Sequence, residues 1–402
     1  MEKILNKGVR GMIDEQSVFL SVISDYLHDR KSIINDVDWK QLYRYSQAHQ
    51  LTTIVYSQCR NCMPTDICSI FQKDSMQIIA HNVRCEVDIN SVLSKLKENG
   101  VKACLVKGFT VSEYYPIWQH RSMGDADIIT KDRDTASSIL KSCGFLCEES
   151  SEQEKEYIFR NNYCEIELHN QLEYESDEVG NDKNKVFFNS FDGYINDGVL
   201  DISFHFLYLF LHLRKHLMKY GVGFRQFLDI AVLTARCKKI NWTWVVEKGR
   251  ELDLLEFIKT VLALNERWFG IDSPIPCASI NDAFACEATE YIFNNGVFGQ
   301  IHGEDMQQLR IIRAQNDQYT FFDMLKNAFK MIFLNYHAMC SLDYCGFLRK
   351  HPLLLPYAWL KRICLLLRRK GLKKESKKLK HSFVSKNEIQ DQNLFFEKWG
   401  LL

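Results

Sequence analysis

Apolar side chains recur every three or four residues along most of this chain, which is the spacing of one face of an α-helix. The pattern fills the first hundred residues, and its last run, from Ser75 to Asn99, stops at Gly100, a residue suited to the left-handed end of a helix. Helical spacing returns in two strongly apolar runs, 204–217 and 224–237, which we expect to form a helical hairpin. Further helices are expected at 241–270, 280–295, 304–335 and 353–380.

The residues between these helical parts carry the pattern of a small sheet. Five short runs are rich in strand-forming residues: 101–106, 126–130, 145–149, 156–160 and 163–169. A helix is expected at 132–143, and a short one before Pro116. The last two strands flank Asn161 and Asn162, which tolerate the positive φ of a tight hairpin turn. The pattern predicts an α+β fold with a small mixed β-sheet core, flanked by N-terminal and C-terminal helical segments.

A chain of 402 residues is too long for one compact core, so we expect two or three domains. Changes in pattern place the boundaries of four segments. We predict an N-terminal helical segment at 1–100, an α/β core at 101–200, a helical domain at 201–340 and a basic C-terminal helical region at 341–402.

Composition is that of an ordinary globular protein and excludes a disordered chain. The N-terminus has no apolar signal region and no run of about 18 apolar residues occurs, so we expect a cytoplasmic protein with no transmembrane segment. The fourteen cysteines are then expected to stay reduced. Cys59 and Cys62, with Cys68 after them, have no second pair to complete a zinc site.

Charge is balanced overall but unevenly spread. Residues 349–380 hold twelve Lys or Arg against one acid, Glu375, which leaves 39 basic and 50 acidic residues elsewhere. This balance excludes a chain that binds nucleic acid over its whole surface. The basic C-terminal region is a candidate for contact with an anionic membrane surface or RNA. A core helix with a solvated lysine-rich end explains the same residues equally well.

The stretch HRSMGDADIIT, 120–130, places two aspartates at the start of an expected strand. Because alternate residues of a strand share a face, Asp125 and Asp127 would point to the same side. The same alternation puts Glu165, Glu167 and His169 on one face of a later strand. If the two strands are neighbours, three or four carboxylates converge.

Converging carboxylates repel one another and raise the pKa of one of them, unless cations lie between. Mg²⁺ prefers carboxylate oxygens and is commonly completed by the phosphates of a substrate. Two such ions would orient a hydroxyl nucleophile and neutralise a leaving pyrophosphate. The pattern therefore favours phosphoryl transfer from a nucleoside triphosphate.

In this order, the residues resemble the uncharacterised bacterial nucleotidyltransferase family of the polymerase-beta-like nucleotidyltransferase superfamily. The resemblance covers roughly 35–270. It is carried by Lys107-Gly108, Tyr115-Pro116, Arg121, Gly124-Asp125-Ala126-Asp127 and Glu167-Leu168-His169, and it continues through His212, His216, Arg225, Asp229 and Asn241-Trp242.

The resemblance implies that Asp125 and Asp127 bind catalytic metals and that Glu167 is the third carboxylate. Spacing alone leaves Glu165 open as the third ligand. The chain departs from the superfamily in having Lys107-Gly108 where Gly-Ser is usual, and Glu where the close family more often has Asp.

Nucleotide binding is assigned to Lys107, Gly108, Arg121 and Gly124. Lys107 is expected to meet a phosphate as a point charge and Arg121 with its bidentate fork, while glycine lets the backbone approach a triphosphate.

Several residues have a structural explanation beside the functional one. His212 and His216, four residues apart on a helix, could ligate a metal, but a polar contact between helices is favoured. Arg225 and Asp229 are expected to form an ion pair along one helix. His169 fits either role.

We therefore predict a Mg²⁺-dependent, ATP-binding or other nucleotide-binding enzyme that moves a nucleoside monophosphate from a nucleoside triphosphate to an acceptor. The acceptor is a small molecule, a sugar or a protein side chain. The alternative is a catalytically inactive nucleotide-binding or scaffolding protein with the same fold.

Overall fold

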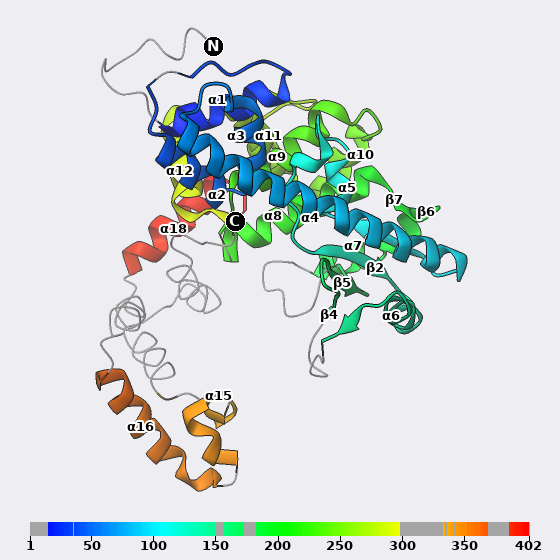
Figure 1. Ribbon diagram of the computed structural model, residues 1–402, viewed down its shortest axis with the longest axis vertical. Coiled ribbons are helices and arrows are strands. Elements are labelled where there is room, and N and C mark those ends of the chain that lie inside the picture. Colours follow the sequence, from blue (N-terminus) through cyan, green and yellow to red (C-terminus); the bar gives the residue numbers. More distant parts are fainter. Residues whose placement is uncertain are drawn as a thin grey trace. The chain divides into compact units, whose positions relative to one another are not determined.

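The computed structural model describes residues 15–34, 36–148, 156–172, 182–219 and 221–297, and near the C-terminus 333, 336–340, 343–349, 351–368 and 386–401. Residue contacts divide the chain into two compact units, Met1–Ile301 with Trp399–Leu401, and His302–Lys398 with Leu402 (Figure 1). The four segment boundaries drawn from sequence stay a prediction. The fold class is confirmed: the first unit combines many helices with one small mixed sheet.

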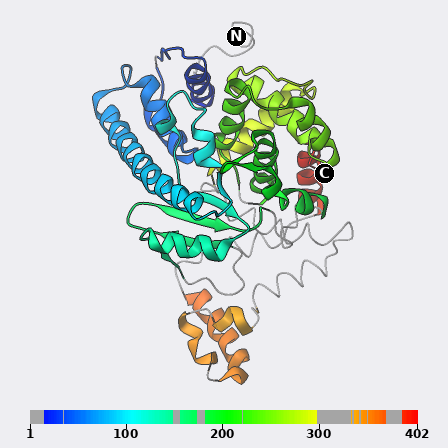
Figure 2. The same cartoon turned by 90° about the vertical axis from the view of Figure 1, so that its right-hand side faces the viewer.

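The first unit begins with four helices, as expected: α1 (Glu15–Leu27), α2 (Trp39–Ala48), α3 (Thr52–Cys59) and α4 (Thr65–Glu98). α4 starts ten residues earlier than predicted, because Pro64 precedes it and Ile67 and Phe71 extend its buried stripe. It ends as predicted, with Gly100 at a φ of +71°. Figures 1 and 2 show that the C-terminal part of α4 lies beside the sheet, whose core cluster takes Cys85, Ile89, Val92 and Leu96 from this helix.

The sheet has five strands in the order β1-β2-β5-β4-β3. They are β1 (Ala103–Val106), β2 (Ala126–Thr130), β3 (Leu146–Cys147), β4 (Glu156–Arg160) and β5 (Glu165–His169). Only β2 and β5 are parallel, and the other neighbours are antiparallel. The chain passes from β2 through α6 (Arg133–Ser142) before it returns to the sheet. All five predicted strands are present, although β3 has only two residues.

One face of this sheet is apolar and the other polar. Ile128, Ile166 and Leu168 are fully buried and belong to a core cluster that also takes residues from α4 and α6. Burying each such side chain stabilises the fold by about 1.5–3 kcal/mol. The alternate positions of β2 and β5 therefore face the other way, towards the helices that follow.

The hairpin between β4 and β5 is present, but the expected reason for its turn is wrong. Neither Asn161 nor Asn162 has a positive φ. Instead the Asn161 side chain accepts hydrogen bonds from the backbone N–H groups of Tyr163 and Cys164, at 2.9 and 2.7 Å. The asparagine thus closes the turn through its amide oxygen.

Helices complete the first unit. Between the strands lie α5 (Gly108–Ser112) and the short η1 (Trp118–His120), and after β5 come α7 (Asp182–Phe188), η2 (Phe191–Tyr194) and a small ribbon of β6 (Ile195–Asn196) and β7 (Val199–Leu200). The long helices α8 (Ile202–Lys219), α9 (Phe224–Arg236), α10 (Trp242–Glu251), α11 (Leu255–Phe269) and α12 (Asp282–Asn295) follow. The helical pattern at 241–270 forms two helices, because the chain turns at Asp253, whose φ is +56°.

The described part of the second unit is helical: α15 (Tyr336–Cys340), η4 (Asp343–Arg349), η5 (Pro352–Leu354), α16 (Leu355–Arg368) and α18 (Lys386–Lys398). A small core joins Met339, Cys345, Leu348 and Ala358. The helix expected at 304–335 lies outside the described residues apart from Phe333, as does most of the basic run after Arg368.

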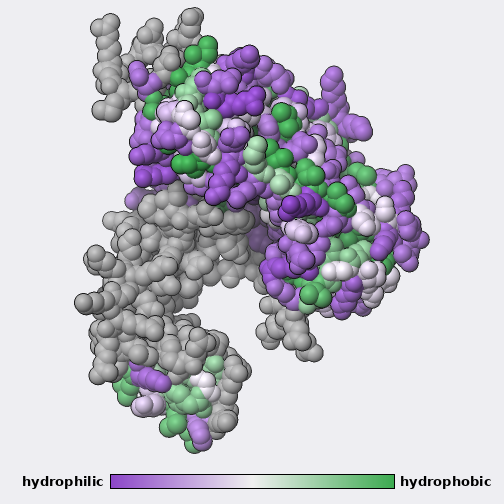
Figure 3. Space-filling model, in the orientation of Figure 1, coloured by the Kyte–Doolittle hydropathy of each residue, from purple (hydrophilic) through white to green (hydrophobic). Residues whose placement is uncertain are grey.

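Polar side chains cover most of the described surface in Figure 3. Within the described ranges, no helix is both long and apolar enough to cross a membrane. The cysteines described there are free thiols, and no metal-ligand cluster forms around Cys59 and Cys62.

Candidate active site

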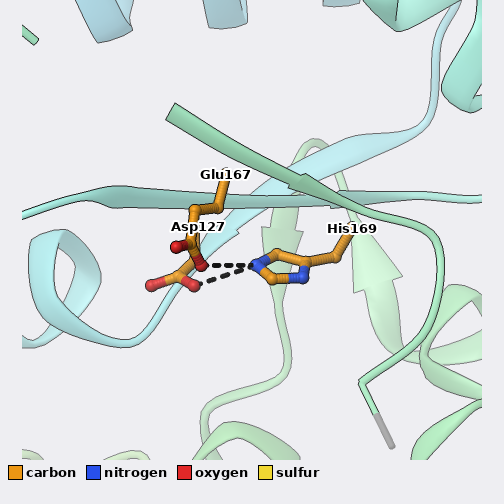
Figure 4. A group of neighbouring side chains, drawn as sticks. All are labelled: Asp127, Glu167 and His169. Carbon is orange, nitrogen blue, oxygen red and sulfur yellow. Dashed lines mark hydrogen bonds and ion pairs between the residues drawn. The ribbon is translucent and has the colours of Figure 1, made fainter. Parts of the chain in front are cut away.

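Two acidic side chains meet where β2 and β5 run side by side. Asp127 and Glu167 are direct partners in the parallel register, so both leave the sheet on its polar face. His169, two residues after Glu167, joins them: its Nε2 lies 3.0 Å from Asp127 Oδ1 and 3.4 Å from Glu167 Oε2 (Figure 4). Ligand atoms of the three residues all lie within 4.8 Å of one another. The arrangement could hold one cation.

Lys107 supplies a positive charge to the same point. It follows β1, whose last residue pairs with Asp127, and its Nζ lies 2.5 Å from Asp127 Oδ1. Its backbone has a φ of +57°, uncommon for a residue with a side chain. The Lys107 N–H donates to His205 Nε2 at 2.8 Å, which holds this turn. Burial lowers the pKa of His205 to about 4, so the ring stays neutral and able to accept.

Charges at this point are strongly coupled. Burial alone would raise the pKa of Asp127, but Lys107 and His169 together lower it to about 2. Burial would lower the pKa of His169, whereas hydrogen bonds to Asp127 and Glu167 raise it to about 9. Burial would raise the pKa of Glu167, but the hydrogen bond to His169 and the charges of Lys107 and His169 together lower it. At neutral pH the two carboxylates are ionised and face two cations.

Asp125 lies at the rim rather than in the cluster. It precedes β2 and is exposed, although it lines the same cavity. Partial removal of its carboxyl group from water, with the negative charges of Asp127 and Glu167, raises its pKa to about 6. Of the three predicted metal ligands, the structure brings Asp127 and Glu167 together, adds His169 and leaves Asp125 at the edge.

The two candidate third acids have different surroundings. Glu165 forms an ion pair with Arg160, its direct partner on β4. Arg160 also pairs with Glu148, and these side chains are largely exposed. Glu167 instead lines the cavity with Asp127. The structure thus separates two residues that spacing alone leaves equivalent.

Arg121 and Asp229 form a buried ion pair beside this cluster. The guanidinium donates from Nε to Asp229 Oδ1 at 2.8 Å and from Nη2 to Oδ2 at 2.7 Å. The Tyr115 hydroxyl donates to the same Oδ1 at 2.7 Å. The bidentate fork that sequence assigned to a phosphate is therefore occupied by a carboxylate.

The two predicted nucleotide-binding glycines differ in their surroundings. A Cβ added to Gly108 would lie 2.6 Å from Arg121 Nη1, so glycine is needed there to admit the guanidinium. A Cβ at Gly124 would meet no atom within 4 Å. Gly108 therefore has a packing role in this structure, and Gly124 borders open space.

These groups line a cavity of about 260 Å³. The sheet side contributes the carboxylates and Lys107, and the opposite wall comes from α8 and α9. That wall includes His212, Lys215, His216, Arg225 and Asp229. Carboxylates and basic groups thus face one another across a small polar space.

The helix residues singled out by sequence have other partners than expected. Asp229 pairs with Arg121, so the expected ion pair with Arg225 is wrong. Arg225 instead donates from Nη1 to the Ser122 carbonyl at 3.0 Å. The rings of His212 and His216 lie 4.4 Å apart by their centroids. Burial lowers the pKa of His216 to about 3, so it is neutral.

The fold thus combines a five-stranded mixed sheet with a cavity that is walled by helices and lined by paired carboxylates. The chain belongs to a family described as uncharacterised nucleotidyltransferase, whose model matches residues 35–270. No curated protein and no solved structure matches the chain. The matched range contains every residue of the cavity described above.

Proposed function

We propose that this chain transfers a nucleoside monophosphate from a nucleoside triphosphate to an acceptor, in a reaction that depends on Mg²⁺. The observation that carries the proposal is the direct pairing of Asp127 with Glu167 on parallel strands, at the floor of a cavity. Membership of a nucleotidyltransferase family supports it. We also assign the family to the bacterial, polymerase-beta-like group, because of the Gly-Asp-x-Asp motif that runs into the start of β2 and the acid on β5.

The side chains fit a divalent cation of this kind. Asp127 and Glu167 offer the oxygen ligands that Mg²⁺ prefers, with Asp125 at the rim as a further carboxylate. Lys107 and His169 balance the negative charges of Asp127 and Glu167, which shows that this cluster accommodates positive charge. When bound, such an ion neutralises charge on the leaving pyrophosphate and favours ionisation of an attacking hydroxyl.

The chain's own residues supply the rest. Lys107, next to Asp127, is placed to contact a phosphate as a point charge. Asp125, at the rim of the cavity, is placed to accept a proton from an acceptor hydroxyl. Arg121 has a positioning role: the Asp229 carboxylate holds the Arg121 guanidinium against Gly108.

The acceptor is a small molecule, a sugar or a protein side chain, and the nucleotide is ATP or another nucleoside triphosphate. We place the reaction in the cytoplasm. The basic C-terminal region is proposed to contact an anionic membrane surface.

Pyrophosphate release from labelled nucleoside triphosphates tests the proposal, with and without Mg²⁺. Asp127→Asn and Glu167→Gln are expected to lower the rate by about 10³-fold or more, because each removes a charge from the cation site. Glu165→Gln is the matched control: it lies on the same strand, two residues away, outside the cavity. Its rate should equal that of the parent, and EDTA should abolish release in both.

Two results would contradict the proposal. Release that persists in Asp127→Asn or in EDTA would place the chemistry elsewhere. Nucleotide binding with no release, across acceptor pools of small molecules, sugars and proteins, would favour the inactive nucleotide-binding protein instead.

A further inference from the structure

Arg225 is a half-buried cation on the helical wall of the cavity, and its contacts leave its charge poorly balanced. It is the second residue of α9, and Nη1 donates to the Ser122 carbonyl at 3.0 Å. Its Nε is buried and has no hydrogen-bond partner. A buried N–H of a charged group left in this state costs free energy unless an acceptor completes its contacts.

The nearest carboxylate does not meet this need. Asp229 lies one turn further along α9, but Arg121 and Tyr115 occupy its oxygens. Arg121 also places a like charge beside Arg225. Burial and this like charge lower the pKa of Arg225 to about 10, so the side chain remains protonated at neutral pH.

The surroundings of Arg225 favour an anion with several oxygens. Lys215 and His216 of α8 line the same wall, and the N-terminal residues Arg225 and Gln226 of α9 face the cavity. The positive end of the helix dipole adds to the attraction for an anion. Lys107 and His169 balance the charges of Asp127 and Glu167 on the sheet side, so these carboxylates leave the attraction for an anion in place.

We propose that Arg225, with Lys215 and His216, forms a subsite for the pyrophosphate portion of the nucleoside triphosphate. The identity of the ligand rests on the proposed function, whereas the anion subsite rests on the contacts of Arg225. A cavity of about 260 Å³ is smaller than the roughly 300–1,000 Å³ of pockets that enclose whole drug-sized ligands. The phosphates therefore occupy the cavity, and the nucleoside lies outside, beyond the exposed rim at Gly124 and Asp125.

The test is binding of inorganic pyrophosphate to the full chain in EDTA, measured by calorimetry. Arg225→Gln is expected to weaken binding by about 10- to 100-fold, the effect of losing a charge-assisted hydrogen bond. Arg225→Lys keeps the positive charge but loses the planar guanidinium, so its pyrophosphate affinity should lie between those of the parent and Arg225→Gln. Arg236→Gln is the matched control, because it removes one positive charge from the same helix at a site that contacts Leu27 and Asp29.

Thermal unfolding of each variant identifies loss of folding. Should Arg225→Gln fail to fold, the comparison of Arg225→Lys with the parent decides the question. Equal pyrophosphate affinity in the parent and the folded Arg225 variants would overturn the subsite, as would a parent that binds pyrophosphate no better than sulfate.

Asp127→Asn separates this inference from the proposed function. This variant should lose transfer but keep pyrophosphate binding, because Arg225 is unchanged. Arg225-dependent pyrophosphate binding in a parent without transfer activity would refute the proposed function and leave the subsite standing. Transfer with an unchanged KM in Arg225→Gln would refute the subsite alone.

Discussion

Single side chains decide the geometry of the candidate site, and only some of them follow from the sequence. Alternation along a strand is enough to place Glu167 with His169, because the period of two is a property of the backbone. The choice between Glu165 and Glu167 needs the partner strand, since Arg160 lies opposite Glu165. His205 carries no signal in the sequence, because its role depends on a contact with Lys107 across 98 positions.

Gly108 gives a sharp prediction at this scale. Gly108→Ala would place a methyl group 2.6 Å from Arg121 Nη1. The guanidinium cannot move aside cheaply, because two hydrogen bonds hold it to Asp229. We expect a loss of about 1–3 kcal/mol in the free energy of unfolding, measured with urea.

Gly124→Ala is the control for this substitution. A Cβ there meets no atom within 4 Å, so its stability should match that of the parent. Equal stability of the two alanine variants would show that Arg121 does not pack against Gly108.

At the scale of elements, local signals predict the helices and strands better than they predict their pairing. The stop at Gly100 and the five strand runs follow from local chemistry. The parallel pairing of β2 with β5 does not follow in this way, because α6, β3 and β4 lie between the two strands in the sequence. Its register is set when alternate residues of both strands are buried against α4 and α6. This long-range pairing is what creates the carboxylate cluster.

The packing of helices around His49 predicts a loss of stability in mild acid. His49 follows α2 and contacts Phe19, Phe224 and Phe293, from α1, α9 and α12. Burial lowers its pKa to about 3, against about 6.5 in the unfolded chain. Below pH 6.5 the unfolded state therefore binds more protons, and stability falls as the pH falls.

Between pH 7.5 and 5.5, His49 alone should lower the free energy of unfolding by about 1.4 kcal/mol. His49→Gln cannot titrate but can still accept the Phe224 N–H, which His49 Nδ1 accepts at 3.4 Å. Urea unfolding at the two pH values should show a smaller pH dependence in the variant by this amount. An identical pH dependence in the two proteins would contradict the burial of a neutral imidazole.

At the scale of the whole molecule, Trp399–Leu401 belong to the first unit, although the preceding helix α18 belongs to the second. Trp399 is fully buried, with its ring 5.9 Å from Phe227 and 6.3 Å from Phe257 by the ring centroids. Sequence periodicity cannot place this residue, because its contacts lie more than a hundred positions away.

Trp399→Ala should therefore destabilise the first unit. Truncating a buried tryptophan costs about 3–5 kcal/mol, through lost burial and the cavity left behind. Urea unfolding followed by circular dichroism measures the change. Phe395 and Phe396 are unchanged, so the variant tests the packing of the Trp399 side chain alone. A change below about 1 kcal/mol in the free energy of unfolding would contradict this packing.

The position of Trp399 also determines how membrane contact must be tested. Deleting the basic C-terminal region would also remove Trp399, so a truncated chain that no longer bound membranes could have lost binding because the first unit unfolded. Substitution avoids that problem. In the described part of the second unit, Leu353, Leu354, Tyr357 and Leu360 are exposed apolar residues beside the start of the basic run, a combination suited to an anionic bilayer surface.

Neutralising Lys373, Lys374 and Lys377 to Gln should weaken binding to vesicles containing phosphatidylserine by about two orders of magnitude at low salt, at about 1 kcal/mol for each charge. These lysines lie outside the described residues, and the prediction rests on their charge alone. Neutralising Lys73, Lys97 and Lys141 of the first unit is the charge-matched control and should leave binding unchanged. Binding should also weaken at high salt, because screening shortens the reach of the lysine charges. Equal binding to neutral vesicles, or preference for RNA over vesicles at the same salt, would contradict the membrane assignment.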